Sequence, residues 1–180
     1  VDLTMTAGTL SGTQNITVTG AVVGTDGGFS LTGGTLEQRA GLAKNFGTSS
    51  NPTAWSFNNL TFSNSNPAGS GTTHTTQSGG SGTITVAGTL TIGKAGDSAG
   101  TTLDLSSRTW IFTGTSPISV TSSPAATLTI NTSTIRFAGT SALTVPLSYS
   151  YYNLELRPNG SGGPNYTLGS GASQILTVAS

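Results

Sequence analysis

The chain has no cysteine and a single histidine, His74, among its 180 residues. Without cysteine it forms no disulfide bond, and it has neither a thiol nucleophile nor cysteine-ligated zinc. Because His74 lies in a stretch rich in Gly, Ser and Thr, we expect its ring to be solvated rather than held as a general base. We therefore predict no catalytic, cofactor-binding or metal-binding residues, and a protein that is not an enzyme.

Charged residues are scarce too. Six Lys or Arg balance six Asp or Glu, so the formal net charge is zero and only 7% of the residues are charged. Nucleic acid requires clustered Lys and Arg, and no such cluster occurs, so we expect no nucleic-acid partner. A polar but uncharged surface favours a protein that works outside the cell or associates with itself, because little charge repulsion opposes contact between copies.

Long hydrophobic runs are also missing, and we expect no membrane span. The chain begins at Val1 without a basic segment or an apolar leader, which we interpret as a mature or excised product. Its length is that of one domain, residues 1–180, with a continuous core.

Thr, Ser and Gly are abundant instead, with 34, 25 and 26 residues, nearly half of the chain. Apolar–polar–apolar triplets recur between them, such as Ile84–Val86 and Leu143–Val145. A period of two is typical of β-strands with one buried face, and the Gly, Asn, Ser and Pro between triplets favour turns. Strands this short need partners stacked on both sides.

Apolar strand positions return about every 25 residues in three series, a period typical of stacked repeats. The series are Leu10, Leu36, Leu60, Ile84, Trp110 and Ile135; Ile92, Ile118, Leu143 and Leu168; and Leu103, Leu128, Leu154 and Val178. They predict an all-β fold, a parallel β-solenoid with three short strands per coil, about 25 residues per coil and about seven coils. Ile118, Leu143 and Leu168 would then stack on one inner face, whereas the alternative, a β-sandwich or jelly roll, would scatter them.

Two stretches interrupt the repeat of about 25 residues. Residues 36–46 contain charges and helix-forming residues, and we expect a decorated corner there, either a short helix or a charged loop. Residues 63–82 contain no apolar side chain beyond Ala68, and we expect a long flexible loop.

Only one pair of carboxylates can be placed near each other from the sequence. Asp104 and Glu155 each follow a member of the third series by one residue, which predicts them on one outer face, about 10 Å apart at the strand spacing. We interpret them as solvated charges rather than as a glycosidase pair. The Thr-X-Thr triplets also suggest ice binding, but Glu37 and Arg136 interrupt the row of threonines.

Aromatic residues form two groups. Trp55 and Trp110 stand at strand positions, where large rings usually fill the core. Tyr149, Tyr151 and Tyr152 follow Pro146, and tyrosine is favoured at interfaces. These three tyrosines, with the Trp55 region, are our candidate contacts to a surface glycan or another partner.

The Gly/Thr/Ser-rich runs GTITVAGTLTIG (82–93) and AATLTINTSTIRFAG (125–139) resemble the right-handed β-helical repeats of microbial surface proteins, including adhesins, autotransporter passengers and filament proteins. Pectate lyases share that fold, but the Asp clusters that carry their activity are missing. The resemblance implies an extracellular or cell-surface protein with a structural or adhesive role.

The ends of the chain refine this expectation. Strand-like triplets begin at Leu3 and Met5 and finish at Leu176 and Val178, with no capping element evident at either end. We predict these four residues as subunit contacts in a head-to-tail homopolymer, a filament or surface layer. The alternative function is an adhesin or carbohydrate-binding module.

Overall fold

A computed structural model describes residues 1–47, 53–66, 71–76, 81–157, 164–169 and 177–178. These residues form short β-strands and turns and contain no helix. The strands are β1 (Leu3–Met5), β2 (Thr9–Gly12), β3 (Ile16–Val18), β4 (Val22–Gly24), β5 (Gly28–Leu31), β6 (Thr35–Ala40), β7 (Lys44–Phe46), β8 (Trp55–Phe57), β9 (Asn59–Asn64), β10 (Thr72–Thr76), β11 (Ile84–Val86), β12 (Leu90–Ile92), β13 (Thr101–Asp104), β14 (Thr109–Phe112), β15 (Ile118–Val120), β16 (Thr127–Thr129), β17 (Thr134–Phe137), β18 (Leu143–Val145), β19 (Ser150–Tyr151), β20 (Asn153–Leu156), β21 (Tyr166–Leu168) and β22 (Thr177–Val178).

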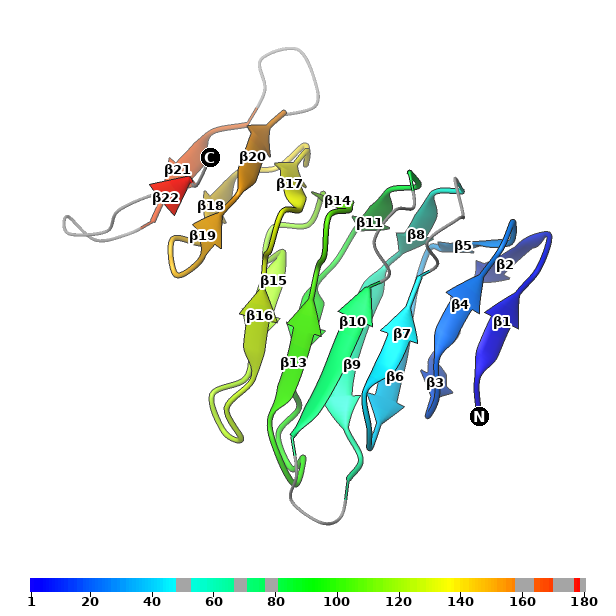
Figure 1. Cartoon of the computed structure of the whole chain (residues 1–180). Coiled ribbons are helices and arrows are strands. Elements are labelled where there is room, and N and C mark those ends of the chain that lie inside the picture. Colours follow the sequence, from blue (N-terminus) through cyan, green and yellow to red (C-terminus); the bar gives the residue numbers. More distant parts are fainter. Residues whose placement is uncertain (48–52, 67–70, 77–80, 158–163, 170–176, 179–180) are drawn as a thin grey trace.

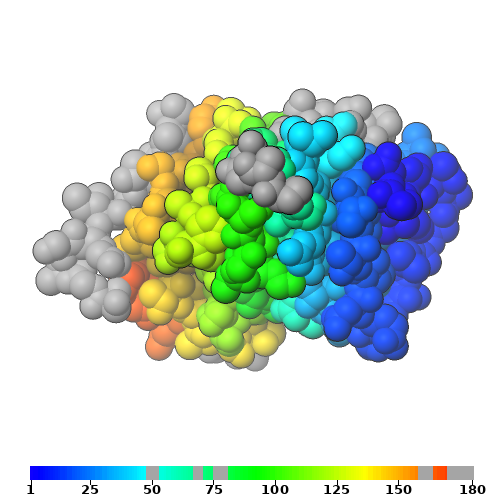
Figure 2. All heavy atoms as spheres, turned by 90° about the horizontal axis from the view of Figure 1, so that it is seen from below, coloured from blue at the N-terminus to red at the C-terminus, as the bar shows by residue number. Residues whose placement is uncertain are grey.

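The strands wind into a parallel β-solenoid with three strands per coil. Face A has the order β1-β4-β7-β10-β13-β16, face B the order β2-β5-β8-β11-β14-β17-β20, and face C the order β3-β6-β9-β12-β15. Every third strand thus returns to the same face, one coil further along the axis, and face A lies in front in Figure 1. Consecutive parts of the sequence form successive bands along the axis (Figure 2), so each coil packs on its neighbours. The predicted fold class is confirmed.

The predicted constant register is only partly correct. Ile84, Trp110 and Ile135 are paired on face B. Leu36 and Leu60 pair with each other, but on face C. Coil length also varies, because the step from Leu10 to its partner Phe29 is much shorter than the step from Leu60 to its partner Leu90. Corners of different length separate strands that still pair, so a fixed spacing assigns some residues to the wrong face.

The second series is shifted by two positions. Ile118 pairs with Leu90, and the partner of Ile92 is Val120. Ile118 and Leu143 are not paired as predicted, because β15 ends face C and β18 pairs with β21 in a separate two-stranded sheet. If every third strand is counted along the chain, β18 and β21 stand at the positions of face C strands, and β19 and β22 stand at those of face A strands. The winding therefore continues although the ladders break.

Both interruptions contain strands that the sequence pattern did not predict. Residues 36–46 form no helix or protruding loop: β6 lies within face C and buries alternate side chains, among them Leu36, Gln38 and Ala40. Within 63–82, β9 continues to Asn64 and Thr72–Thr76 is strand β10, paired on both sides. Residues 67–70 and 77–80 of the predicted loop lie outside the described residues. Polar side chains face inward here, so the pattern of apolar residues did not reveal these strands.

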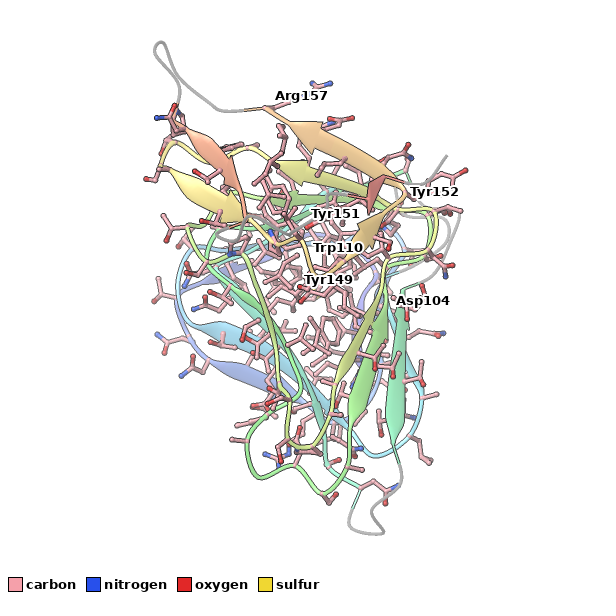
Figure 3. All side chains as sticks on the ribbon, turned by 90° about the vertical axis from the view of Figure 1, so that its left-hand side faces the viewer. Asp104, Trp110, Tyr149, Tyr151, Tyr152 and Arg157 are labelled. Atoms are coloured by element: carbon pink, nitrogen blue, oxygen red, sulfur yellow. The ribbon has the colours of Figure 1, made fainter. Side chains whose placement is uncertain are left out.

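Aromatic rings fill the interior. Phe29 packs edge-on to Trp55 with ring centroids 4.8 Å apart, and Phe46 packs edge-on to Phe62 at 4.9 Å. The column continues through Trp110, Phe112, Phe137 and Tyr151. Seen along the axis in Figure 3, Trp110 and Tyr151 lie between the three faces. The prediction that Trp55 and Trp110 belong to the core is confirmed.

Candidate functional site

The three candidate tyrosines do not share a surface. Tyr151 is fully buried and donates a hydrogen bond from its hydroxyl to the carbonyl oxygen of Pro146 at 2.5 Å. Burial raises the pKa of its phenol. Tyr149 is half-buried, and only Tyr152 is exposed, toward the outside in Figure 3. Trp55 is also buried and donates its indole N–H to the carbonyl oxygen of Gly27. Tyr151 and Trp55 are therefore out of reach of a glycan, whereas Tyr152 is accessible on the surface.

The predicted carboxylate pair is separated. Asp104 lies on β13 of face A, whereas Glu155 lies on β20 of face B. The side chain of Asp104 accepts hydrogen bonds from the Asn131 amide and the Ser106 backbone. Glu155 lies 2.6 Å from Arg136, and this hydrogen bond is the main cause of its lowered pKa. The expectation that they share one face was wrong, because Leu154 lies on face B, whereas Leu103 and Leu128, from the same series, pair on face A.

His74 is not solvated but fully buried, pointing inward from β10. Its Nδ1 lies 3.0 Å from the Gln38 side-chain oxygen, and its ring is edge-on to Phe62 at 5.1 Å. Burial lowers the pKa of His74 to about 4, partly opposed by the backbone of Ser63. The imidazole is therefore neutral near pH 7 and serves as a core side chain.

A groove crosses the outside of face C. Its floor is a row of outward side chains on four paired strands, Thr17, Glu37, Thr61 and Thr91. At the usual strand spacing this row is about 14 Å long. Asn15 and Thr35 lie beside the floor, and residues 93–95 with Thr121 also line the groove, whose volume is about 550 Å³.

One ion pair lies within this groove. The Lys94 ammonium is 3.3 Å from both carboxylate oxygens of Glu37. Glu37 also accepts a hydrogen bond from the Ser63 hydroxyl at 2.6 Å. These contacts hold the carboxylate in one position and neutralise its charge, so the groove combines hydroxyl groups with a paired cation and anion.

The loop that carries Lys94 is anchored by Asp97, whose side chain is only 1% exposed. One Asp97 carboxylate oxygen accepts hydrogen bonds from the backbone N–H groups of Asn64 at 3.0 Å and Lys94 at 2.9 Å. Arg39 approaches the other oxygen at 4.0 Å. A buried carboxylate with two backbone donors fixes the loop against β9 and so positions the wall of the groove.

Both ends of the solenoid present strand edges. Within the described strands, β1, β2 and β3 pair on one side only, as do β20 and β21 at the other end. Leu3 and Met5, two predicted subunit contacts, are half-buried at the first edge. Leu176 lies outside the described residues, and Val178 is described only as backbone, paired with Tyr151.

Sequence reasoning missed the groove. Glu37 was assigned to a protruding corner, and nothing in the sequence relates it to Lys94, which is 57 residues away. The signal that was available is the apolar–Thr–apolar triplet, because Thr61 and Thr91 are each the middle residue of one.

Comparison with known proteins returned no match, whether against protein-family profiles, curated sequences or solved structures. Among the described residues, no helix is long and apolar enough to cross a membrane. The residues that the structure describes include no group of three or more His, Asp or Glu side chains placed to hold a metal ion.

Proposed function

We propose that this protein is a non-enzymatic structural protein of the cell exterior that stacks end to end into a filament or surface layer. The observation that supports this most directly is that, among the described strands, the solenoid has unpaired strand edges at both of its ends. An unpaired edge is a template for another strand. Head-to-tail contacts use two different surfaces, so they extend indefinitely when they do not close.

In the proposed contact, the strands of the two ends would pair in register. On face B, Leu154 faces inward on the last strand and Leu10 faces inward on the first. Continuing the ladder from β20 to β2 of a second copy therefore places Leu154 opposite Leu10 and Glu155 opposite Ser11. On face C, β21 would meet β3, which brings the 50% exposed Leu168 onto Val18. Apolar side chains exposed at the ends would be buried by this contact.

On face A, the proposed contact requires β1 of the next copy to displace β22. Because β22 already follows β19 there, β1 of the next copy fits this register only by taking the place of β22. The exchange is reasonable, since β22 pairs over two residues whereas β1 offers three. Leu3 and Met5 would then face the core beside Tyr151.

Charge also favours head-to-tail over head-to-head contact. Asp2 and Asp26 are the only charged side chains before Glu37, whereas the chain after Arg108 holds two arginines and one glutamate. One end is therefore acidic and the other slightly basic. The location outside the cell rests on the composition, which is rich in Ser, Thr and Gly and poor in charge.

Disulfide trapping tests the register, because the chain has no cysteine of its own. A Ser11→Cys, Glu155→Cys double variant should form ladders of covalent oligomers on oxidation, since facing residues on adjacent strands lie within disulfide range. Within one copy these positions lie at opposite ends and cannot react. The matched control is Ser11→Cys with Thr85→Cys, because Thr85 is on the same face but on a strand paired on both sides.

Wild-type protein should also form rods visible by electron microscopy and sediment as concentration-dependent oligomers. Equal cross-linking in both double variants, or a wild-type chain that stays monomeric at high concentration, would overturn the proposal.

A further inference from the structure

We propose that the groove on face C binds a neutral, hydroxyl-rich polysaccharide lying across strands β3, β6, β9 and β12. This site differs from the predicted tyrosine contacts and does not depend on end-to-end assembly. The inference rests on the chemistry of the groove floor, the neutrality of the groove and the anchoring of its wall.

The floor offers hydroxyl groups at a regular spacing. Thr17, Thr61 and Thr91 stand on paired strands in one row with Glu37. A threonine hydroxyl both donates and accepts hydrogen bonds, as does each hydroxyl of a sugar. A polymer with a short repeat can therefore bond to several strands in turn, which a compact ligand cannot do.

The charges in the groove favour a neutral ligand. Lys94 and Glu37 are paired at 3.3 Å, so the groove presents no net charge to a polyanion. Lys94 still has donors to spare, because an ammonium group has three. Lys94 can therefore donate to a sugar hydroxyl while the Glu37 carboxylate accepts from one. Both would be charge-assisted hydrogen bonds, which are stronger than neutral ones.

The wall of the groove is held in place before any ligand arrives. The buried carboxylate of Asp97 accepts the backbone N–H of Lys94, and Ser98 donates its hydroxyl to the carbonyl oxygen of Asn66. A loop fixed in this way loses little conformational freedom on binding. The groove also has the size of ligand sites in other proteins, at about 550 Å³.

Co-sedimentation with insoluble polysaccharides tests the site. The probes are cellulose, chitin and starch granules, with alginate beads as the polyanionic comparison. The groove variant carries Thr61→Val and Thr91→Val, which remove two hydroxyls and keep both the side-chain shape and the β-propensity. The matched control is Thr85→Val, which removes an outward hydroxyl from face B.

We expect wild-type protein and Thr85→Val to bind at least one neutral polysaccharide, and the groove variant to bind it about tenfold more weakly. Each neutral hydrogen bond contributes a factor of about 2 to 10 in affinity. Thermal melting checks that each variant is folded. If the double variant does not fold, Lys94→Ala, which alters an exposed side chain, takes its place with the same expected loss.

Three results would overturn the proposal. The first is wild-type protein that stays in the supernatant with all three neutral polysaccharides. The second is stronger binding to alginate than to any of them. The third is equal binding by the wild-type and groove variants.

Discussion

Acidification should destabilise this protein through one side chain. His74 is fully buried, and burial lowers its pKa to about 4 from the ordinary value of 6.5. In the unfolded chain the imidazole regains that ordinary value. Between these two pKa values the unfolded state binds more protons than the folded state, so the free energy of unfolding falls as the pH falls.

The size of the effect follows from the shift. A pKa difference of one unit corresponds to about 1.4 kcal/mol. Lowering the pH from 7 to 5 should therefore reduce the free energy of unfolding by about 2 kcal/mol, and the loss should level off at about 3 kcal/mol near pH 4. His74 is the only histidine and the chain has no cysteine, so no other side chain ordinarily titrates in the middle of this range.

Urea unfolding followed by tryptophan fluorescence measures this directly, because Trp55 and Trp110 are both buried. The control is His74→Gln, which keeps a polar side chain but does not titrate, and whose unfolding free energy should be nearly constant from pH 7 to 5. A wild-type stability that is also constant over this range, or a folded-state His74 resonance that titrates near pH 6.5 in NMR, would refute the reasoning.

Three further changes should alter stability, each measured by urea unfolding beside a control. Gly47→Ala should cost about 1–3 kcal/mol more than Gly8→Ala: both glycines have positive φ, but a Cβ at Gly47 would lie 2.6 Å from the buried Arg108 guanidinium, which hydrogen bonds to Gly82 hold in place, whereas none of the described atoms lies within 4 Å of one at Gly8. Asp97→Ala should cost about 2–4 kcal/mol, because two backbone N–H groups lose their acceptor; a loss of less than about 0.5 kcal/mol, the low end for one hydrogen bond, would contradict its anchoring role. Trp110→Ala should cost about 3–5 kcal/mol by leaving a cavity in the aromatic column, and a cost no larger than that of an outward substitution on β14 would show that the column is not tightly packed.

The contacts that form the groove could not be predicted from the sequence. Glu37 meets Lys94 across 57 residues, and the wall between them depends on Asp97 reaching the backbone of Asn64. Each of these residues is ordinary where it stands in the sequence. They come together because the corners between their strands have particular lengths, and a constant repeat in the sequence does not reveal those lengths.

Local alternation determined the class of fold. Triplets such as Ile84–Val86 alternate apolar and polar side chains, and this is a property of neighbouring residues that needs no knowledge of the rest of the chain. The return of apolar strand positions about every 25 residues in three series then predicted three parallel strands per coil.

Tertiary structure alone decided the register and the polar interior. A strand pairs with whichever strand lies one coil away, whether the coil is short, as from Leu10 to Phe29, or long, as from Leu60 to Leu90. A constant count therefore fails wherever a corner lengthens. Inside the coil, Nδ1 of the buried His74 meets the side-chain oxygen of Gln38, 36 residues earlier. A buried polar group is stable only with such a partner, and the partner is brought close by winding rather than by sequence.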